Sequence, residues 1–235
     1  MPGIDDGPED LQAALIMGRI AVQDGVRTII ATPHCYDGVY DCQAHDIIAL
    51  TEAFNAALWR EKIGLTVLPG AEIRLTPELV DCFGQGRLLT LGNGWRAVLL
   101  ELPEMFIPAA VIRVIKKLLS RDVRCILAHP ERNSSILAKN DILDDLVYAG
   151  AELQFTGESL TGGFGRESRL LVQKFMAMDV RCYLASDGHD ARKRKPVLAK
   201  AVKHAARLVG REAAAEMVTI ELGNAQKRTD KVLYN

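Results

Sequence analysis

The sequence predicts an α/β fold, a barrel-like sheet of parallel strands surrounded by helices, in a single domain that covers residues 1–235. Two patterns support this prediction. Short apolar runs alternate with segments of helical periodicity in units of about 30 residues, as parallel sheets with right-handed crossovers require. Acidic residues and histidines follow most of the apolar runs, and polar groups at strand ends form the active face of such barrels. The chain contains no linker-like segment and no region of different amino-acid composition.

Six apolar runs predict the strands: residues 27–32, 65–68, 96–102, 123–128, 151–155 and 181–186. Apolar residues at helical spacing predict helices at residues 8–24, 41–62, 108–121, 140–149, 166–178 and 196–209, with a short helix opening at Thr76. Six strands are few for a closed barrel, and the chain starts with a loop-like segment from Pro2 to Pro8. The first strand of the barrel therefore looks missing, and we expect an open sheet edge beside residues 27–32.

The composition excludes several classes of protein. A formal charge of −1 gives no general attraction to nucleic acid or anionic membranes. No apolar run approaches the roughly 18 residues that cross a bilayer, and the acidic N-terminal segment is not a signal peptide. The five cysteines are scattered singly, which predicts reduced thiols in a cytoplasmic protein rather than a disulfide framework. We therefore expect no nucleic-acid partner and no membrane insertion.

Seven acidic residues and histidines are candidate metal ligands, most of them at the ends of predicted strands. They are Asp6, His34, Glu72, Glu101, His129, Asp187 and His189. A mixed set of carboxylates and imidazoles favours manganese, iron or zinc over calcium or magnesium, which prefer shells of oxygen alone. Such ions polarise a phosphoryl oxygen and lower the pKa of bound water. The pattern therefore predicts a metallohydrolase.

Two arginines are candidates for phosphate binding. Arg132 follows His129 by three residues, and Arg194 belongs to the basic run 192–195 that follows His189. A guanidinium at either position can bind two phosphate oxygens and offset charge in the transition state. These two arginines are the predicted catalytic residues.

Each of these features alone also has a simpler explanation. The Asp5-Asp6-Gly7 segment fits a turn and helix cap, a single acid or histidine fits a structural role, and the basic run fits a solvated face. Their recurrence at successive strand ends favours the metal site. Phosphatases with a cysteine nucleophile are excluded, because none of the five cysteines is followed six positions later by arginine.

The candidate residues lie in six motifs that appear in a fixed order. These are Asp5-Asp6-Gly-Pro, Thr32-Pro-His34, Gly70-Ala-Glu72-Ile, Leu100-Glu101-Leu, Ala128-His129-Pro-Glu-Arg132 and Ser186-Asp187-Gly-His189. Together they resemble the manganese-dependent protein-tyrosine phosphatases of bacterial capsule and exopolysaccharide loci, members of the PHP (polymerase and histidinol phosphatase) superfamily. The resemblance runs from about residue 2 to about residue 228.

This resemblance implies a distorted (β/α)7 barrel, up to three manganese ions (with iron, cobalt or zinc as alternatives) and a phosphorylated bacterial tyrosine kinase tail as the partner. Carried over by residue, one ion is held by Asp6, His34 and His189. A second is held by Glu72, Glu101 and His129, and Glu101 and Asp187 contribute to the third, while Arg132 and Arg194 bind the phosphate.

The chain departs from the family at its start. The family opens with a strand that carries Asp-x-His-x-His, and this sequence begins just after the place of that strand. Because every later ligand is present, we expect the coding sequence to continue upstream of Met1. Two alternatives remain: a PHP phosphatase for a small phosphate ester such as histidinol phosphate, and a truncated, catalytically impaired homologue that binds the kinase. The sequence also leaves a homo-oligomer open.

Overall fold

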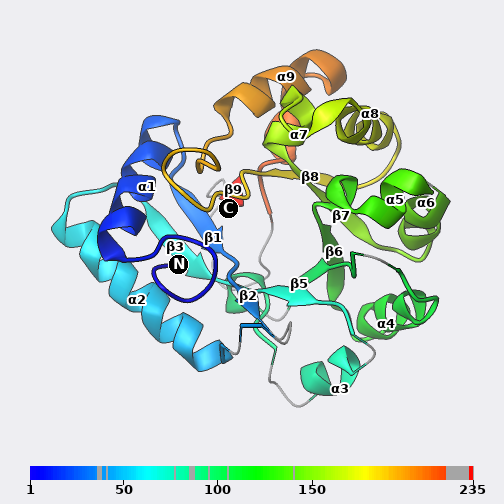
Figure 1. Cartoon of the computed structure of the whole chain (residues 1–235), viewed down its shortest axis with the longest axis horizontal. Coiled ribbons are helices and arrows are strands. Elements are labelled where there is room, and N and C mark those ends of the chain that lie inside the picture. Colours follow the sequence, from blue (N-terminus) through cyan, green and yellow to red (C-terminus); the bar gives the residue numbers. More distant parts are fainter. Residues whose placement is uncertain are drawn as a thin grey trace.

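The structure is a computed structural model that describes residues 1–35, 39–40, 42–76, 78–84, 88–94, 96–104, 106–139, 141–220 and 233–234. Its strands are β1 (Thr28–Ala31), β2 (His34–Cys35), β3 (Thr66–Pro69), β4 (Glu72–Arg74), β5 (Ala97–Glu101), β6 (Arg124–Ala128), β7 (Glu152–Thr156), β8 (Cys182–Ala185) and β9 (Leu233–Tyr234). All of them belong to one sheet, and every pairing is parallel. Figure 1 shows the helices around the outside of these strands. The predicted α/β class with a parallel sheet is confirmed.

The sheet closes on itself. Its order is β2-β4-β5-β6-β7-β8-β9-β1-β3. Two residues separate β1 from β2, and two separate β3 from β4, so each pair forms one interrupted strand. Because β1 pairs with β3 and β2 pairs with β4, the two ends of the order are parts of the same neighbouring segments. The pairings therefore run around a ring (Figure 1).

Strand β9 corrects the prediction of an open edge. Its residues pair with β1, Ile29 with Leu233 and Ile30 with Tyr234, and Tyr234 also pairs with Ala185 of β8. The backbone groups of β1 that face away from β3 therefore have β9 beside them, and β1 is not an edge strand. A strand of only two residues is too short to be recognised from the sequence.

The helices are α1 (Leu11–Gln23), α2 (Ala44–Arg60), α3 (Leu79–Gly84), α4 (Ala110–Leu119), α5 (Ser134–Ala138), α6 (Asp141–Tyr148), α7 (Gly157–Thr161), α8 (Gly165–Met176), α9 (Ala199–Val209) and α10 (Arg211–Glu216), with 3-10 turns η1 (Leu91–Asn93) and η2 (Pro130–Arg132). The predicted helices all occur, with shifted ends. Residues 41 and 140, where two of them were expected to start, lie outside the described part. Asp10 caps α1 by accepting from the Ala13 N–H at 2.8 Å. Helices α5, α7 and α10 were not predicted.

Three apolar clusters hold the elements in place. The largest lies between the outer face of the sheet and the helices and includes Val98, Leu100 and Phe155. A second joins α1 and α2 to β1 and β3. The third fills the inside of the ring, where Ile30, Leu99 and other residues of alternating strand positions meet. A Cβ at Gly70 would lie 2.7 Å from the Ile30 side chain, so the link from β3 to β4 requires glycine for close packing.

The structure also corrects the prediction of five reduced cysteines. Cys35 on β2 and Cys42 before α2 form a disulfide, with Cα atoms 5.6 Å apart. Seven positions separate them in the sequence. Cys82, Cys125 and Cys182 keep reduced thiols. Among the helices that the structure describes, none is long and apolar enough to cross a membrane.

Candidate metal centre

The seven candidate ligands come together at the carboxyl ends of the strands. His34 and Glu72 come just after the carboxyl ends of β1 and β3, where they begin the short strands β2 and β4, and Glu101 ends β5. His129 directly follows β6, whereas Asp187 and His189 follow β8. Asp6 comes from the loop before α1. The register explains part of this convergence, because His34 pairs with Glu72 and Arg74 pairs with Glu101 across neighbouring strands.

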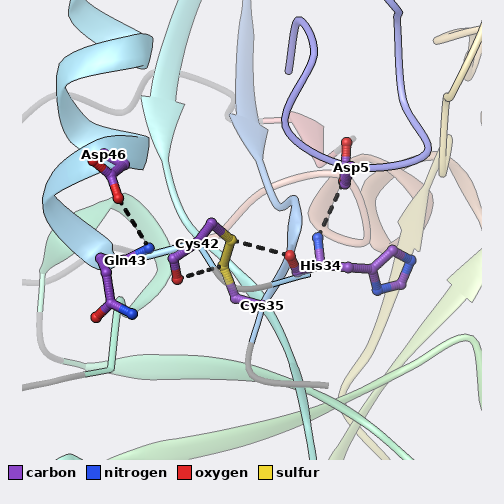
Figure 2. Close-up of a disulfide and its surroundings, with 6 residues drawn as sticks. All are labelled: Asp5, His34, Cys35, Cys42, Gln43 and Asp46. Atoms are coloured by element: carbon purple, nitrogen blue, oxygen red, sulfur yellow. Dashed lines mark hydrogen bonds between the residues drawn. A yellow bond between two sulfur atoms is a disulfide. The ribbon is translucent and has the colours of Figure 1, made fainter. Parts of the chain in front are cut away.

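A first cluster consists of Asp6, His34 and His189. The Asp6 Oδ1 atom lies 3.3 Å from Nε2 of His189 and 3.8 Å from Nε2 of His34. Asp5 fixes the backbone here, since its carboxylate accepts the His34 N–H at 3.1 Å. Figure 2 shows this contact, with the disulfide on one side of His34 and its imidazole pointing to the other. This cluster contains the three residues that the family resemblance assigns to one ion.

Two further clusters continue from the first, linked through His34 and then Glu72. One contains His34, Glu72 and Glu101, and the other contains Glu72, His129 and Asp187. In each cluster the potential ligand atoms all lie within 4.8 Å of one another. The grouping differs from the expected one, because Glu101 lies with His34 and Glu72, whereas Asp187 lies with Glu72 and His129. All seven predicted residues are nevertheless in one continuous set.

The electrostatics of these residues favour a cation between them. Burial raises the pKa of Glu101, and the nearby negative charge of Glu72 raises it further. Burial alone would lower the pKa of His129, but Glu72, whose Oε1 lies 2.8 Å from Nε2, and Asp187 raise it to about 9. Two partly or fully buried carboxylates in one cluster repel each other unless positive charge lies near both. The donor set therefore fits metal ions that accept nitrogen and oxygen ligands.

Arg132 and Arg194 both contact Asp187. Each donates a hydrogen bond from its guanidinium to the same oxygen, Oδ2. Burial would raise the pKa of Asp187, but His129, Arg194 and Arg132 together hold it below its ordinary value. The loop that carries Arg194 folds back on itself, since the His189 N–H donates to the Arg194 carbonyl at 2.8 Å. The two predicted phosphate-binding residues thus lie together beside the ligand clusters.

A cavity of about 250 Å³ opens between the ligands and the arginines. Its lining includes Asp6, His34, Glu101, His129, Arg132 and Arg194. A phosphoryl group in this cavity has candidate metal ligands on one side and guanidinium groups on the other. Two of the ligands adopt left-handed backbone conformations, His129 with φ 30° and Asp187 with φ 51°. Such conformations are uncommon for residues other than glycine and cluster at functional sites.

Three further residues support the site and were not predicted. Arg74 donates to Oε2 of Glu101 at 3.1 Å. Glu131, completely buried, accepts from the Thr156 N–H at 2.9 Å and the Ser159 hydroxyl at 2.7 Å. The ring of Phe164 lies beside the Arg132 guanidinium. The sequence contains a signal only for Arg74: it lies two positions after Glu72, and residues two apart on a strand share one face of the sheet.

Known proteins are similar to this chain in sequence and fold. A family described as "Capsular polysaccharide synthesis, CpsB/CapC" matches residues 1–228. The tyrosine-protein phosphatase YwqE of Bacillus subtilis is 34% identical over 194 residues, which cover 83% of this chain and 76% of YwqE. The tyrosine-protein phosphatase CpsB of Streptococcus agalactiae (serotype III, strain NEM316) is 22% identical over 219 residues, 91% of this chain and 90% of that protein.

A solved structure matches as well. It comes from a study of YwqE from Bacillus subtilis and CpsB from Streptococcus pneumoniae, described there as unique metal-dependent tyrosine phosphatases. The match has a TM-score of 0.86 and 32% sequence identity, and it covers 91% of this chain and 86% of the other. With a family match over nearly its whole length and this agreement in fold, the chain belongs to the CpsB/CapC family of capsular polysaccharide synthesis proteins.

Proposed function

We propose that this protein is a metal-dependent protein-tyrosine phosphatase of capsular polysaccharide synthesis that removes phosphate from the tail of a bacterial tyrosine kinase in the cytoplasm. The observation that carries the proposal is the convergence of seven metal-ligand candidates and two arginines on one cavity, in a chain 34% identical to a tyrosine-protein phosphatase. Manganese is the proposed metal, with iron, cobalt or zinc as alternatives, and the closed sheet is proposed to be the distorted (β/α)7 barrel of the PHP superfamily.

The residues of the three clusters would hold the ions. Asp6, His34 and His189 form one site, and the two clusters that share Glu72 form the others. Bound ions in such a site polarise phosphoryl oxygens and supply a hydroxide near neutral pH. The overlap of the clusters at His34 and Glu72 keeps the sites adjacent, so that one phosphoryl group can reach more than one of them.

Arg132 and Arg194 would bind and orient the phosphoryl group. Both guanidinium groups already converge on one carboxylate oxygen of Asp187, so their positions are set before a substrate arrives. Each arginine has five N–H donors and uses only part of them on Asp187. The remaining donors can bind phosphoryl oxygens and stabilise the charge that develops there in the transition state.

Metal analysis and activity together test this proposal. We expect hydrolysis of a phosphotyrosine peptide to stop in excess chelator and to return with Mn²⁺, because ions held by the three clusters would activate the attacking water. Glu72→Gln should reduce both bound metal and turnover. Glu104→Gln is the matched control, since Glu104 lines the same cavity but lies in none of the three ligand clusters.

Substrate comparison separates the alternatives. A phosphatase for a small ester would turn over histidinol phosphate faster than the phosphotyrosine peptide, and an impaired kinase-binding homologue would turn over neither with Mn²⁺ present. Full activity in excess chelator would contradict the proposal.

A further inference from the structure

Phe164 lies against a functional side chain that it does not neighbour in sequence. The Cζ atom of the Arg132 guanidinium is 4.6 Å from the centre of the Phe164 ring, within the range of a cation–π interaction. Phe164 is partly exposed and comes directly before α8, whereas Arg132 ends η2 after β6. The contact therefore joins the phosphate-binding side of the cavity to a separate part of the fold.

The segment that carries Phe164 has a specific backbone. Gly162 and Gly165 flank it with φ values of 98° and 93°, conformations that other residues rarely adopt. A Cβ at either glycine would meet nothing within 4 Å, so these glycines serve the backbone conformation and not close packing. The turn between α7 and α8 thus directs Phe164 toward Arg132.

The geometry leaves the donors of Arg132 available. A guanidinium donates its hydrogen bonds in its own plane, and an aromatic ring interacts with its face. Asp187 takes one donor of Arg132, and the Cζ atom of the guanidinium lies over the Phe164 ring. An arginine side chain has about 2 kcal/mol of rotamer entropy, and part of that freedom is removed before substrate binds when both contacts are present.

The stretch just before the turn between α7 and α8 also holds the residue next to Arg132. Glu131 in η2 accepts hydrogen bonds from Thr156, at the end of β7, and from Ser159 in α7. The Glu131 and Arg132 side chains of η2 are therefore both held by the stretch from β7 to the start of α8. Because Glu131 is adjacent in sequence to Arg132, the two supports act on neighbouring residues.

We propose that Phe164 is a positioning residue for phosphate binding: its ring holds the Arg132 guanidinium so that the remaining N–H groups face the phosphoryl group. This inference rests on the proposed phosphatase function, in which Arg132 binds the phosphate. Phe164 acts through Arg132 and needs no contact with the reacting atoms.

The test compares three substitutions at one position in the metal-loaded enzyme. Phe164→Leu keeps an apolar side chain but removes the ring, and we expect kcat/KM to fall roughly 3- to 30-fold, the range of a cation–π contact. Phe164→Tyr and Phe164→Trp keep a ring and should remain close to wild type. The inhibition constant of inorganic phosphate should weaken in Phe164→Leu and recover in the two aromatic variants. Tyr148→Leu, on an exposed aromatic residue of α6, is the matched control and should change nothing.

A double-substitution cycle separates this inference from the proposed function. Phe164→Leu should cause no further loss when Arg132 is already alanine, because the ring then has nothing to position. An equal loss in both backgrounds, or a failure of tyrosine and tryptophan to restore phosphate affinity, would overturn the inference and leave the phosphatase proposal intact. If Arg132→Ala has wild-type activity, the role of Arg132 in the proposed function fails, and this inference fails with it. Thermal melting of each variant confirms that the fold is retained.

Discussion

Substitutions of Glu131 should show how much its buried side chain contributes to the free energy of unfolding, separately from the chemistry of the site. Its carboxyl group is completely buried, and one oxygen accepts two hydrogen bonds, from the Thr156 N–H and the Ser159 hydroxyl. In Glu131→Ala the buried Thr156 N–H loses its acceptor, which costs about 1–3 kcal/mol. The space left by the side chain adds to this loss, so we expect the free energy of unfolding to fall by about 2–4 kcal/mol.

The matched variant is Glu131→Gln, which keeps one oxygen in the same place as an acceptor. Burial raises the pKa of Glu131 because it penalises the charged form, so a neutral amide is a close replacement. We expect Glu131→Gln to stay within about 1 kcal/mol of wild type. Glu131→Ala should melt roughly 5–15 °C lower, given about 2–4 °C per kcal/mol in a chain of this size.

The pH dependence has a definite sign. With a folded-state pKa above the ordinary 4.5, Glu131 contributes stability that is fully present below pH 4.5 and is lost as pH rises through the folded-state pKa. The stability of Glu131→Gln relative to wild type should therefore increase as pH rises above 4.5. Urea unfolding of the three proteins at several pH values measures this. The reasoning is refuted if glutamine destabilises as much as alanine, or if alanine changes stability by less than about 0.5 kcal/mol.

Three other predictions follow from the site and the disulfide. Arg132→Ala should lower turnover of a phosphotyrosine peptide by roughly 10²–10³-fold with bound metal unchanged, and a wild-type rate would remove Arg132 from the mechanism. Cys42→Ser should lower the free energy of unfolding by about 2–3 kcal/mol, from the entropy of a ring closed across 7 positions, and equal urea midpoints would contradict this. In chelator-treated protein, the pKa of His129 is about 9 in the folded state and 6.5 in the unfolded state, so its protonated pair with Glu72 stabilises the fold below pH 6.5. This stability is lost as pH rises from 6.5 through 9, and the melting temperature should fall over that range. The fall should be smaller in Glu72→Gln.

Much of the fold was predictable because most strands are buried on both faces. Val98, Leu99 and Leu100 of β5 are completely buried, and such uninterrupted apolar runs stand out in a sequence. Strands β2 and β4 were missed for the opposite reason. They are two and three residues long and begin with the polar residues His34 and Glu72, which pair with each other across the sheet although 38 positions separate them in the sequence.

The candidate ligands were predictable because a strand end has a known place in a barrel. Each such residue needs only its own strand to be recognised, and the parallel sheet then brings them to one face. The supporting residues depend on contacts between distant segments: Arg74 meets Glu101 across 27 positions, and Glu131 meets Ser159 across 28. No local pattern marks such a contact. The disulfide was missed because cysteine spacing alone cannot show which thiols a fold brings together.

The Cys35–Cys42 disulfide has a consequence for how the chain responds to proteases. Together with the backbone between them it forms a covalent ring directly after His34, and Tyr40 within that ring stacks on the His34 imidazole at 6.2 Å between ring centres. A single backbone cut between the two cysteines would therefore leave one covalent molecule. The two pieces would separate on a gel only after reduction, and until then the residues on both sides of the cut would stay tethered beside His34.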